Sequence, residues 1–367
     1  MRTLFLAIIG ALAVLGGPAG AQPYNLTLTG ASPGGLWSTI GAGIDAALAA
    51  AYPGSTITYQ TSSGGLANVS LVASGKVPMG IAADMELTAA YMGRKPFKAP
   101  IKNVRVLLRT YGASARFQMT HVLLNKSFAD KHGIKVFSDI VAKKVPLRVA
   151  INRRGNMDGD ISAMLLAGMG ASLKDIEKWG GQVVRAASRE IVSLMLDRRI
   201  DMAHFGIAYR HPRVREIAKG ITPLLLDTSF SVAQKVADFM GGKVCLVKAE
   251  EYKFLDRNVT TVCVGTVILV NENMDEATAY NLTKGILTNI DKFKAAHRLL
   301  KKKVTKQMMA DPAVVAFHPG AAKYLREAGL LRLGAQARRR RGQRGIPDRR
   351  RRAWRPRVPT SGCATLP

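Results

Sequence analysis

The sequence predicts an α/β protein built from two domains. Strand-like and helix-like segments alternate along the chain, beginning with the strand YNLTLT and the helix LWSTIGAGIDAALAAAY. In that helix Leu36, Ile40, Ile44 and Leu48 recur at helical spacing. Roughly 310 residues lie between two unusual chain ends, which is enough for two ordinary α/β domains. Strands that alternate with helices favour mostly parallel sheets.

The strand and helix pattern starts a second time at PLRVAIN, residues 146–152. Long strand-like stretches near 104–124 and 221–270 are the natural places for the chain to cross between domains. Within the second stretch, TTVCVGTVILVN at 260–271 is predicted to be one strand. We therefore expect a discontinuous first domain at 22–115 and 235–330, and a second domain at 116–234.

The N-terminal segment, residues 1–21, has the features of a secretory signal peptide. Arg2 is followed by an apolar stretch, and Ala19-Gly20-Ala21 provides small residues for cleavage after Ala21. This predicts an exported, periplasmic protein. An uncleaved N-terminal membrane anchor is the alternative.

The C-terminal segment, residues 331–367, differs in composition from the rest. It holds 12 Arg, no Lys and one acidic residue, Asp348. Such a segment cannot bury enough apolar surface to fold, so we expect a disordered Arg-rich tail. The tail either binds an anionic partner or has no function. The net charge of +29 favours acidic ligands but identifies no partner.

The three cysteines are too few for a disulfide scaffold, and no spacing indicates a zinc site. Cys245 and Cys263 lie in strand-like segments. They either pair in an oxidising compartment or remain separate buried thiols. No metal or cofactor is expected.

A Ser/Gly loop precedes the predicted helix at 66–74. Its residues Ser62, Ser63, Gly64 and Gly65 are followed by Leu66 and Ala67, where a phosphate-binding P-loop needs Lys and Ser or Thr. The free N–H groups of a helix start suit a carboxylate or another small anion. Asn68, on the first turn, can point into the same space. The alternative is helix capping by Ser62 or Ser63.

A similar strand, loop and helix occur in LRVAINRRGNMDGDISAM, residues 147–164. Asn156 and Asp158 can cap the helix, and Arg153 and Arg154 place cations beside it. Two helix starts, one from each domain, can face a shared ligand cleft. The alternative is an ordinary cap beside a surface Arg pair.

The turn Gly30-Ala31-Ser32-Pro33-Gly34 matches G-x-S-x-G, the nucleophile motif of a class of hydrolases. The oxyanion hole of that class needs the N–H of the residue after the serine, and Pro33 has none. We expect no enzyme here. An exported serine hydrolase using Ser32 is the alternative function.

Together these segments resemble the substrate-binding proteins of tripartite ATP-independent periplasmic (TRAP) transporters of the TAXI type. The similarity runs from about Tyr24 to Leu330, through LTLTGASPGGLWSTIGAGI, TSSGGLANVSLVASGKVPMGIAAD, RRIDMAHFG and FHPGAAKYLREAGL in this order. It implies a periplasmic binding protein-like fold with a cleft between two α/β domains, and a monomeric receptor without catalysis or cofactor. The implied partners are membrane permease subunits and a small anionic or zwitterionic solute, such as glutamate, and no nucleic acid. A sensor for a membrane kinase is a further alternative.

The resemblance also implies a set of ligand-binding residues. In the first domain they are Gly34, Gly35, Leu36, Trp37, Ser62, Ser63, Gly64, Gly65, Asn68 and Asp84, and in the second Asn156, Met157, Asp158 and Phe205. Two segments depart from the family pattern: Leu36-Trp37 replaces an aromatic pair, and Asn156-Met157-Asp158 replaces Ser-Gly-Thr. An ionised Asp158 repels a carboxylate unless Arg153 or Arg154 offsets its charge.

Overall fold

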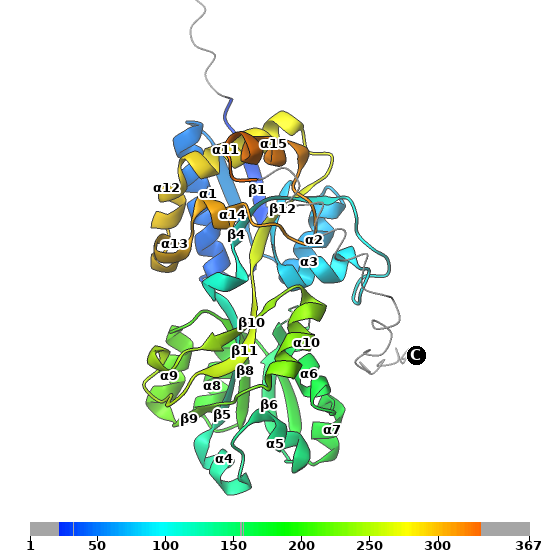
Figure 1. Ribbon diagram of the computed structural model, residues 1–367, viewed down its shortest axis with the longest axis vertical. Helices are drawn as coiled ribbons and strands as arrows, with labels where there is room; N and C mark the ends of the chain where they lie inside the picture. Colours follow the sequence, from blue (N-terminus) through cyan, green and yellow to red (C-terminus); the bar gives the residue numbers. More distant parts are fainter. Residues whose placement is uncertain (1–21, 32, 155, 157, 332–367) are drawn as a thin grey trace, which may run out of the picture.

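The computed structural model describes residues 22–31, 33–154, 156 and 158–331. Two β-sheets, each covered by helices, form two lobes arranged along the long axis of the molecule (Figure 1). We call the upper one lobe 1 and the lower one lobe 2. This arrangement confirms the predicted two-part α/β fold. The described residues do not include the predicted signal peptide at 1–21, residues 332–367 of the predicted tail, Ser32 or Met157.

Lobe 1 is built on a five-stranded sheet with the order β2-β1-β3-β12-β4. Its strands are β1 (Asn25–Thr29), β2 (Thr56–Gln60), β3 (Met79–Ala83), β4 (Val104–Tyr111) and β12 (Thr266–Asn271). Its helices are α1 (Leu36–Ala51), α2 (Gly65–Ala73), α3 (Asp84–Tyr91), α11 (Glu276–Thr288), α12 (Ile290–Ala295), α13 (Arg298–Lys303), α14 (Lys306–Met309) and α15 (Pro319–Glu327).

Lobe 2 is built on a sheet with the order β10-β11-β5-β8-β6-β7, to which β9 adds by pairing with β5. Its strands are β5 (Gln118–Asn125), β6 (Arg148–Asn152), β7 (Gln182–Ala186), β8 (Met202–Ile207), β9 (Pro223–Leu225), β10 (Lys243–Val247) and β11 (Val259–Val264). Its helices are α4 (Lys126–His132), α5 (Phe137–Ala142), α6 (Asp158–Gly168), α7 (Leu173–Lys178), α8 (Ser188–Leu196), α9 (Pro212–Gly220) and α10 (Phe230–Met240). Two short 3-10 turns, η1 (Ala113–Ala115) and η2 (Ala249–Glu251), complete the elements.

Parallel pairing is confined to one part of each sheet. Strand β1 is parallel to β2 and β3, and β6 is parallel to β7 and β8. Strands β5 and β12, in contrast, are antiparallel to their neighbours. The alternation of strands and helices therefore predicted the parallel parts. Strands β10 and β11, with only η2 between them, pair antiparallel, and β9 pairs antiparallel with β5.

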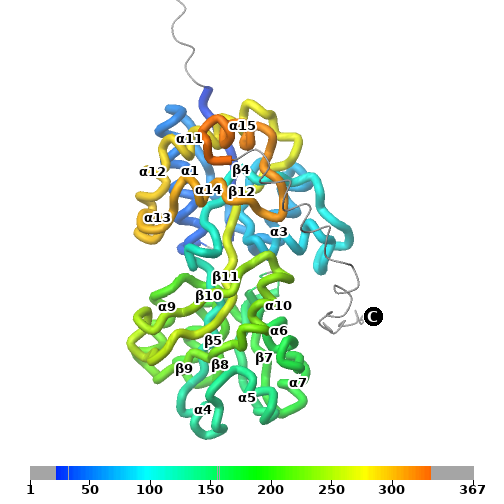
Figure 2. The backbone as a smooth tube through the Cα atoms, viewed as in Figure 1, coloured from blue at the N-terminus to red at the C-terminus, as the bar shows by residue number. Residues whose placement is uncertain are grey.

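The chain crosses between the lobes twice. It enters lobe 2 between β4 and β5, through η1, and returns to lobe 1 between β11 and β12 at Gly265 (Figure 2). The stretch at 260–271, predicted as one strand, is thus two strands of different sheets. A side chain at position 265 would lie 2.7 Å from Arg109 Nη1 and 2.9 Å from Asp84 Oδ2, so this crossing needs glycine.

The expected second domain boundary needs correction. Position 234/235 falls inside α10, whose Val232, Ala233 and Val236 belong to the same core cluster as Leu165 of lobe 2. Because β10 and β11 also pair in the lobe 2 sheet, the return crossing is at Gly265. The first expected boundary, 115/116, falls in the segment that connects β4 to β5.

The core of lobe 1 contains the helical face that the sequence predicted. Ile40, Ile44 and Leu48 of α1 are fully buried. The core cluster on the α6 and α10 side of lobe 2 also includes Met85 and Ala89 of α3, so the lobes pack against each other there.

Cys245 and Cys263 form a disulfide between the neighbouring strands β10 and β11, with their Cα atoms 5.9 Å apart. Of the two alternatives for these cysteines, the structure shows pairing. Among the described residues, no helix combines the length and the apolar character that crossing a membrane requires.

Candidate functional site

Four side chains form a hydrogen-bonded chain from lobe 1 to lobe 2. Trp37 Nε1 donates to the Tyr111 hydroxyl at 3.3 Å, and this hydroxyl donates to Gln118 Oε1 at 3.4 Å. Gln118 Nε2 then donates to Asp158 Oδ1 at 3.2 Å. Trp37 lies on the first turn of α1 and Asp158 begins α6, so two residues predicted from different domains meet at the lobe junction. In sheets with parallel strands, ligands generally bind beyond the carboxyl ends of those strands, where both helices begin.

Asp158 is buried against the lobe 2 sheet. Its carboxylate fills the space beside Gly206 of β8, where a Cβ atom would collide with it, and it accepts a hydrogen bond from the Gly206 backbone. Burial raises the pKa of Asp158 to about 6, and the neighbouring charge of Asp160 adds to the effect. Neither Arg153 nor Arg154 is among the groups that act on this pKa. Arg153 instead lies 3.6 Å from Glu190.

Glu86, on α3, is a buried carboxylate that the sequence did not indicate. Its Oε2 accepts a hydrogen bond from the backbone N–H of Ala83 at 2.9 Å, and the Gly65 backbone also donates to this carboxylate. Burial raises its pKa to about 8, and the charges of Asp158 and Asp160 add to the rise. The helix start predicted to hold a ligand's anionic group therefore holds a carboxyl group of the protein itself.

Ser62 and Asn68 hold the Ser/Gly loop in place. The Asn68 side chain has no solvent exposure, and its Nδ2 donates to the carbonyls of Gly30 at 3.0 Å and Ile81 at 2.7 Å. Ser62 Oγ lies 2.6 Å from Asn68 Oδ1 and accepts from the Gly64 N–H at 3.0 Å. The expectation that Asn68 points into a wet cleft is therefore wrong. Its amide joins the ends of β1 and β3, and Ser63 is the exposed member of the loop.

Asp84 forms an ion pair at the crossing between the lobes. Both of its carboxylate oxygens accept from Arg109 Nη1, at 2.9 and 2.8 Å, and Oδ2 also accepts from the Gly265 N–H at 2.9 Å. These contacts join β3, β4 and the return crossing. The contacts of the Asp84 side chain therefore stabilise the connection between the lobes.

Phe205 lies on the opposite face of the lobe 2 sheet from Asp158. Neighbouring residues of a strand point to opposite faces, and Gly206 faces Asp158. Phe205 is accordingly buried in the core cluster that contains Ile191 and Ile217 of α8 and α9. It was predicted near the ligand, and this alternation explains why it is a core residue instead.

The remaining predicted residues shape the two helix starts. Gly34 is exposed with φ of +71°, Gly35 precedes α1 and accepts from Ser38 Oγ at 2.8 Å, and Leu36 packs on the lobe 1 core. Asn156 Oδ1 accepts from the Asp158 N–H at 3.0 Å, which is the capping role that its sequence position allowed.

An aromatic cluster adjoins the hydrogen-bonded chain. The Phe117 ring centroid lies 5.2 Å from that of Tyr111 and 6.4 Å from that of Tyr209, which follows β8. The Tyr209 hydroxyl is buried and has no hydrogen-bond partner among the described residues. Tyr111, Gln118 and Tyr209 were missed by sequence analysis; the only signal was the position of Tyr111 and Gln118 in the first predicted crossing stretch.

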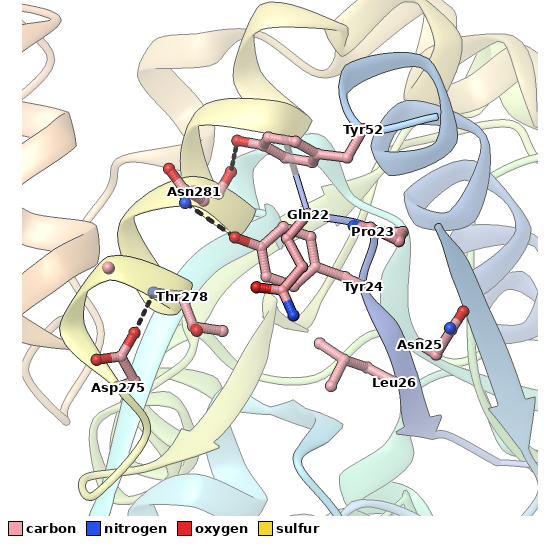
Figure 3. Close-up of a pocket in the computed structure, with 10 residues that line it drawn as sticks. Gln22, Pro23, Tyr24, Asn25, Leu26, Tyr52, Asp275, Thr278 and Asn281 are labelled. Atoms are coloured by element: carbon pink, nitrogen blue, oxygen red, sulfur yellow. Dashed lines mark hydrogen bonds between the residues drawn. The ribbon is translucent and has the colours of Figure 1, made fainter. Parts of the chain in front are cut away.

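A separate pocket of about 460 Å³ lies at the end of lobe 1 away from this junction (Figure 3). The start of β1 and the first turns of α11 line it. Tyr24 accepts a hydrogen bond from Asn281 Nδ2 at 2.8 Å, and Tyr52 donates to the Asn281 carbonyl at 2.8 Å. The pocket contains none of the residues predicted to bind a ligand. Across the part of the chain that the structure describes, no group of three or more His, Cys, Asp or Glu residues is arranged to hold a metal ion.

Several solved structures are similar to this one, each at low sequence identity. PhnD1 from Prochlorococcus marinus (MIT 9301) in complex with methylphosphonate is 11% identical, with a TM-score of 0.49 over 84% of this chain and 100% of that chain. MatC from Rhodopseudomonas palustris with bound malate is 13% identical, with a TM-score of 0.48 over 76% and 88%. The periplasmic aliphatic sulphonate binding protein SsuA from Escherichia coli is 14% identical, with a TM-score of 0.40 over 83% and 84%.

A family model covers nearly all of the described fold. The model of the NMT1-like family matches residues 28–329, which include both sheets, both crossings and every described member of the hydrogen-bonded chain. The chain therefore belongs to the NMT1-like family.

Proposed function

We propose that this protein is a periplasmic solute-binding receptor of a TRAP transporter. It captures a small organic acid or amino acid between its lobes and delivers it to membrane permease subunits. The observation that carries the proposal is the chain from Trp37 through Tyr111 and Gln118 to Asp158, because it links the two lobes by polar side chains at their junction.

The links of this chain are long, from 3.2 to 3.4 Å, and several of its members remain partly exposed. A solute with its own donors and acceptors replaces such links at little cost, because each neutral hydrogen bond contributes only about 1 kcal/mol net. When the solute bonds to Tyr111 on one side and to Gln118 or Asp158 on the other, it holds the lobes together. Binding then favours the closed form by the affinity difference between the two forms.

The crossing segments allow the lobes to move relative to each other. Gly265 is a single residue between two strands of different sheets, and η1 separates β4 from β5. The Asp84–Arg109 ion pair holds the lobe 1 side of the return crossing rigid. Movement is thus concentrated in a few backbone positions, as in hinge closure around a ligand.

The test is native mass spectrometry of protein purified from cells that export it, followed by identification of small molecules released on unfolding. The proposal predicts one organic acid or amino acid bound to each chain. It is contradicted if no small molecule co-purifies and no organic acid or amino acid raises the melting temperature. The Ser32→Ala variant, tested on ester substrates, separates this function from a hydrolase.

A further inference from the structure

The lobe junction is unusual in its charge. Asp158 of lobe 2 and Glu86 of lobe 1 are both more than nine-tenths buried. The charged neighbours that act on them are themselves acids: Asp158 and Asp160 act on Glu86, and Asp160 acts on Asp158. At neutral pH Asp158, with a pKa of about 6, is largely ionised, whereas Glu86, with a pKa of about 8, is largely protonated. The negative charge that attracts a cation here is therefore that of Asp158.

The arginines of the crossing segments cannot compensate this charge, because other partners hold them. Arg109 pairs with Asp84 and also donates to the carbonyls of Asp311 and Pro312. Arg116 pairs with Glu251 at 2.6 Å and donates to the Leu246 carbonyl. A solute carboxylate beside Asp158 therefore meets neither of these two guanidinium groups. Arg185, near the start of α6, acts on Asp160 and donates to the Asn152 carbonyl at 3.4 Å.

A buried hydroxyl beside Asp158 lacks a partner. Thr120 is 4% exposed, and its Oγ1 has no hydrogen-bond partner among the described residues. Thr120 pairs directly with Gly206, the residue that Asp158 covers, and points to the same sheet face as Gln118, two residues earlier. An unsatisfied buried hydroxyl costs about 1–3 kcal/mol, so a bound donor here is favourable.

Aromatic rings complete this environment. Tyr111 carries the hydroxyl of the hydrogen-bonded chain, and Phe117 and Tyr209 extend its ring surface. The Arg116 guanidinium lies over the Tyr209 ring, 5.1 Å from its centroid, so this ring already has a cationic partner. Aromatic faces attract cations, with ammonium ligands as a well-known case. Carboxyl groups, an unpartnered hydroxyl and aromatic rings all favour a positively charged nitrogen.

We propose that the solute carries a positively charged amino group, which binds to Asp158 and Thr120 beside the Tyr111–Phe117–Tyr209 cluster. This inference rests on the proposed receptor function and narrows its ligand class. The solute is an amine-bearing compound with at most one carboxylate, such as an amino acid with a neutral or basic side chain. Dicarboxylates and acidic amino acids are disfavoured, because their extra carboxylate meets Asp158 and Glu86.

The test uses a matched five-carbon series: glutarate, glutamate, glutamine and cadaverine, titrated calorimetrically. We expect glutamine or cadaverine to bind at least 10-fold more tightly than glutarate. In Asp158→Asn, the affinity for the amine-bearing member should fall 10- to 100-fold, or about 1.4–2.8 kcal/mol, while any glutarate affinity stays equal or rises. The control Asp130→Asn changes an exposed carboxylate on the same lobe and should leave every affinity unchanged.

A second variant keeps the proposal testable if Asp158→Asn does not fold. Thr120→Val removes only the unpartnered hydroxyl, so it should keep or raise the melting temperature and still weaken the amine-bearing ligand. The inference is overturned if glutarate binds as tightly as glutamine and cadaverine, if no amine-bearing member binds, or if neither variant weakens amine binding. Tight glutarate binding would contradict the amine preference but would still agree with a receptor function. The receptor function itself is tested separately, by the mass spectrometry described above.

Discussion

The Glu86 carboxylate lies against the backbone of Gly65 and accepts a hydrogen bond from it, in space that any side chain at position 65 would need. The start of α2 is thus occupied by a side chain of the protein. Free N–H groups at a helix N-terminus commonly bind an oxygen acceptor, and here the acceptor is the Glu86 carboxyl group of the following helix. A substitution at Gly65 therefore disturbs the packing of the Glu86 side chain, whether or not a ligand binds at this loop.

The first prediction concerns the pH dependence that Glu86 confers. Its pKa of about 8 lies above the value of 4.5 expected in the unfolded chain, so between these values the folded state holds a proton that the unfolded state has released. The contribution of Glu86 to the free energy of unfolding should therefore fall as the pH rises from 6.5 to 8. The buried His121, His204 and His211 have lowered pKa values in the folded state, so their contribution to stability rises with pH through the unfolded value of 6.5, and this opposing contribution extends into the lower part of the range.

Urea denaturation of the wild type and Glu86→Gln at pH 6.5, 7.2 and 8 measures the effect. Glutamine keeps an acceptor oxygen but has no proton to release, and the histidine contribution is common to both proteins. The stability of the wild type relative to the variant should therefore fall as the pH rises. Equal slopes in the two proteins would show that Glu86 is ionised throughout.

The second prediction concerns Asn68. Asn68→Ala removes the amide N–H groups that donate to the Gly30 and Ile81 carbonyls and leaves Ser62 without its amide partner. The Gly30 carbonyl keeps the hydrogen bond from the Ser62 hydroxyl. Since each buried group left unsatisfied costs about 1–3 kcal/mol, we expect a destabilisation of roughly 2–4 kcal/mol. The control Asn273→Ala changes an exposed side chain and should stay within about 0.5 kcal/mol. A stability loss no larger than that of the control would contradict the role assigned to Asn68.

The third prediction concerns the disulfide. Cys245 and Cys263 are 18 residues apart, and closing a loop of this size stabilises a protein by about 3 kcal/mol in the chain-entropy model. Cys245→Ser should therefore lower the midpoint of urea unfolding under non-reducing conditions, and reductant should lower the wild type to the same midpoint. If denatured, unreduced wild type gave three titratable thiols, the disulfide would be absent.

The fourth prediction concerns the Tyr111 hydroxyl. Tyr111→Phe keeps the buried ring but removes the link between Trp37 and Gln118. We expect little change in melting temperature and an affinity for the co-purified solute that falls about 10-fold, the equivalent of about 1.4 kcal/mol. Tyr280→Phe removes an exposed hydroxyl that bonds to Glu327 on the outer side of lobe 1, and serves as the matched control. Identical affinities in the two variants would remove Tyr111 from the site.

The sequence predicted the fold well because the spacing of apolar residues along a helix indicates which of its faces is buried. Ile40, Ile44 and Leu48 form the buried face of α1 as their spacing required. It failed at TTVCVGTVILVN, because an apolar run does not reveal that its two halves, on either side of Gly265, belong to different sheets. Whether a strand continues or crosses depends on tertiary partners, here Arg109 and Asp84.

The site was only partly predictable for the same reason. Asp158 was identified from its position at a helix start and Trp37 from the family resemblance, and the structure links them through Tyr111 and Gln118. The occupant of the Ser/Gly loop was not predictable, since Glu86 reaches Gly65 only through the packing of α3 beside α2. The prediction that Phe205 lies near the ligand was wrong because the sequence of β8 does not show which of its residues face α6 and which face the core on the other side of the sheet.

Small-angle X-ray scattering of the protein with and without its co-purified solute tests the central claim most directly. If the solute binds at the junction linked by Tyr111, Gln118 and Asp158, the solute-free protein should have the larger radius of gyration, and adding solute should restore the compact form with the lobes packed as in Figure 1. A solute that binds at one per chain while the scattering curve stays unchanged would contradict capture between the lobes.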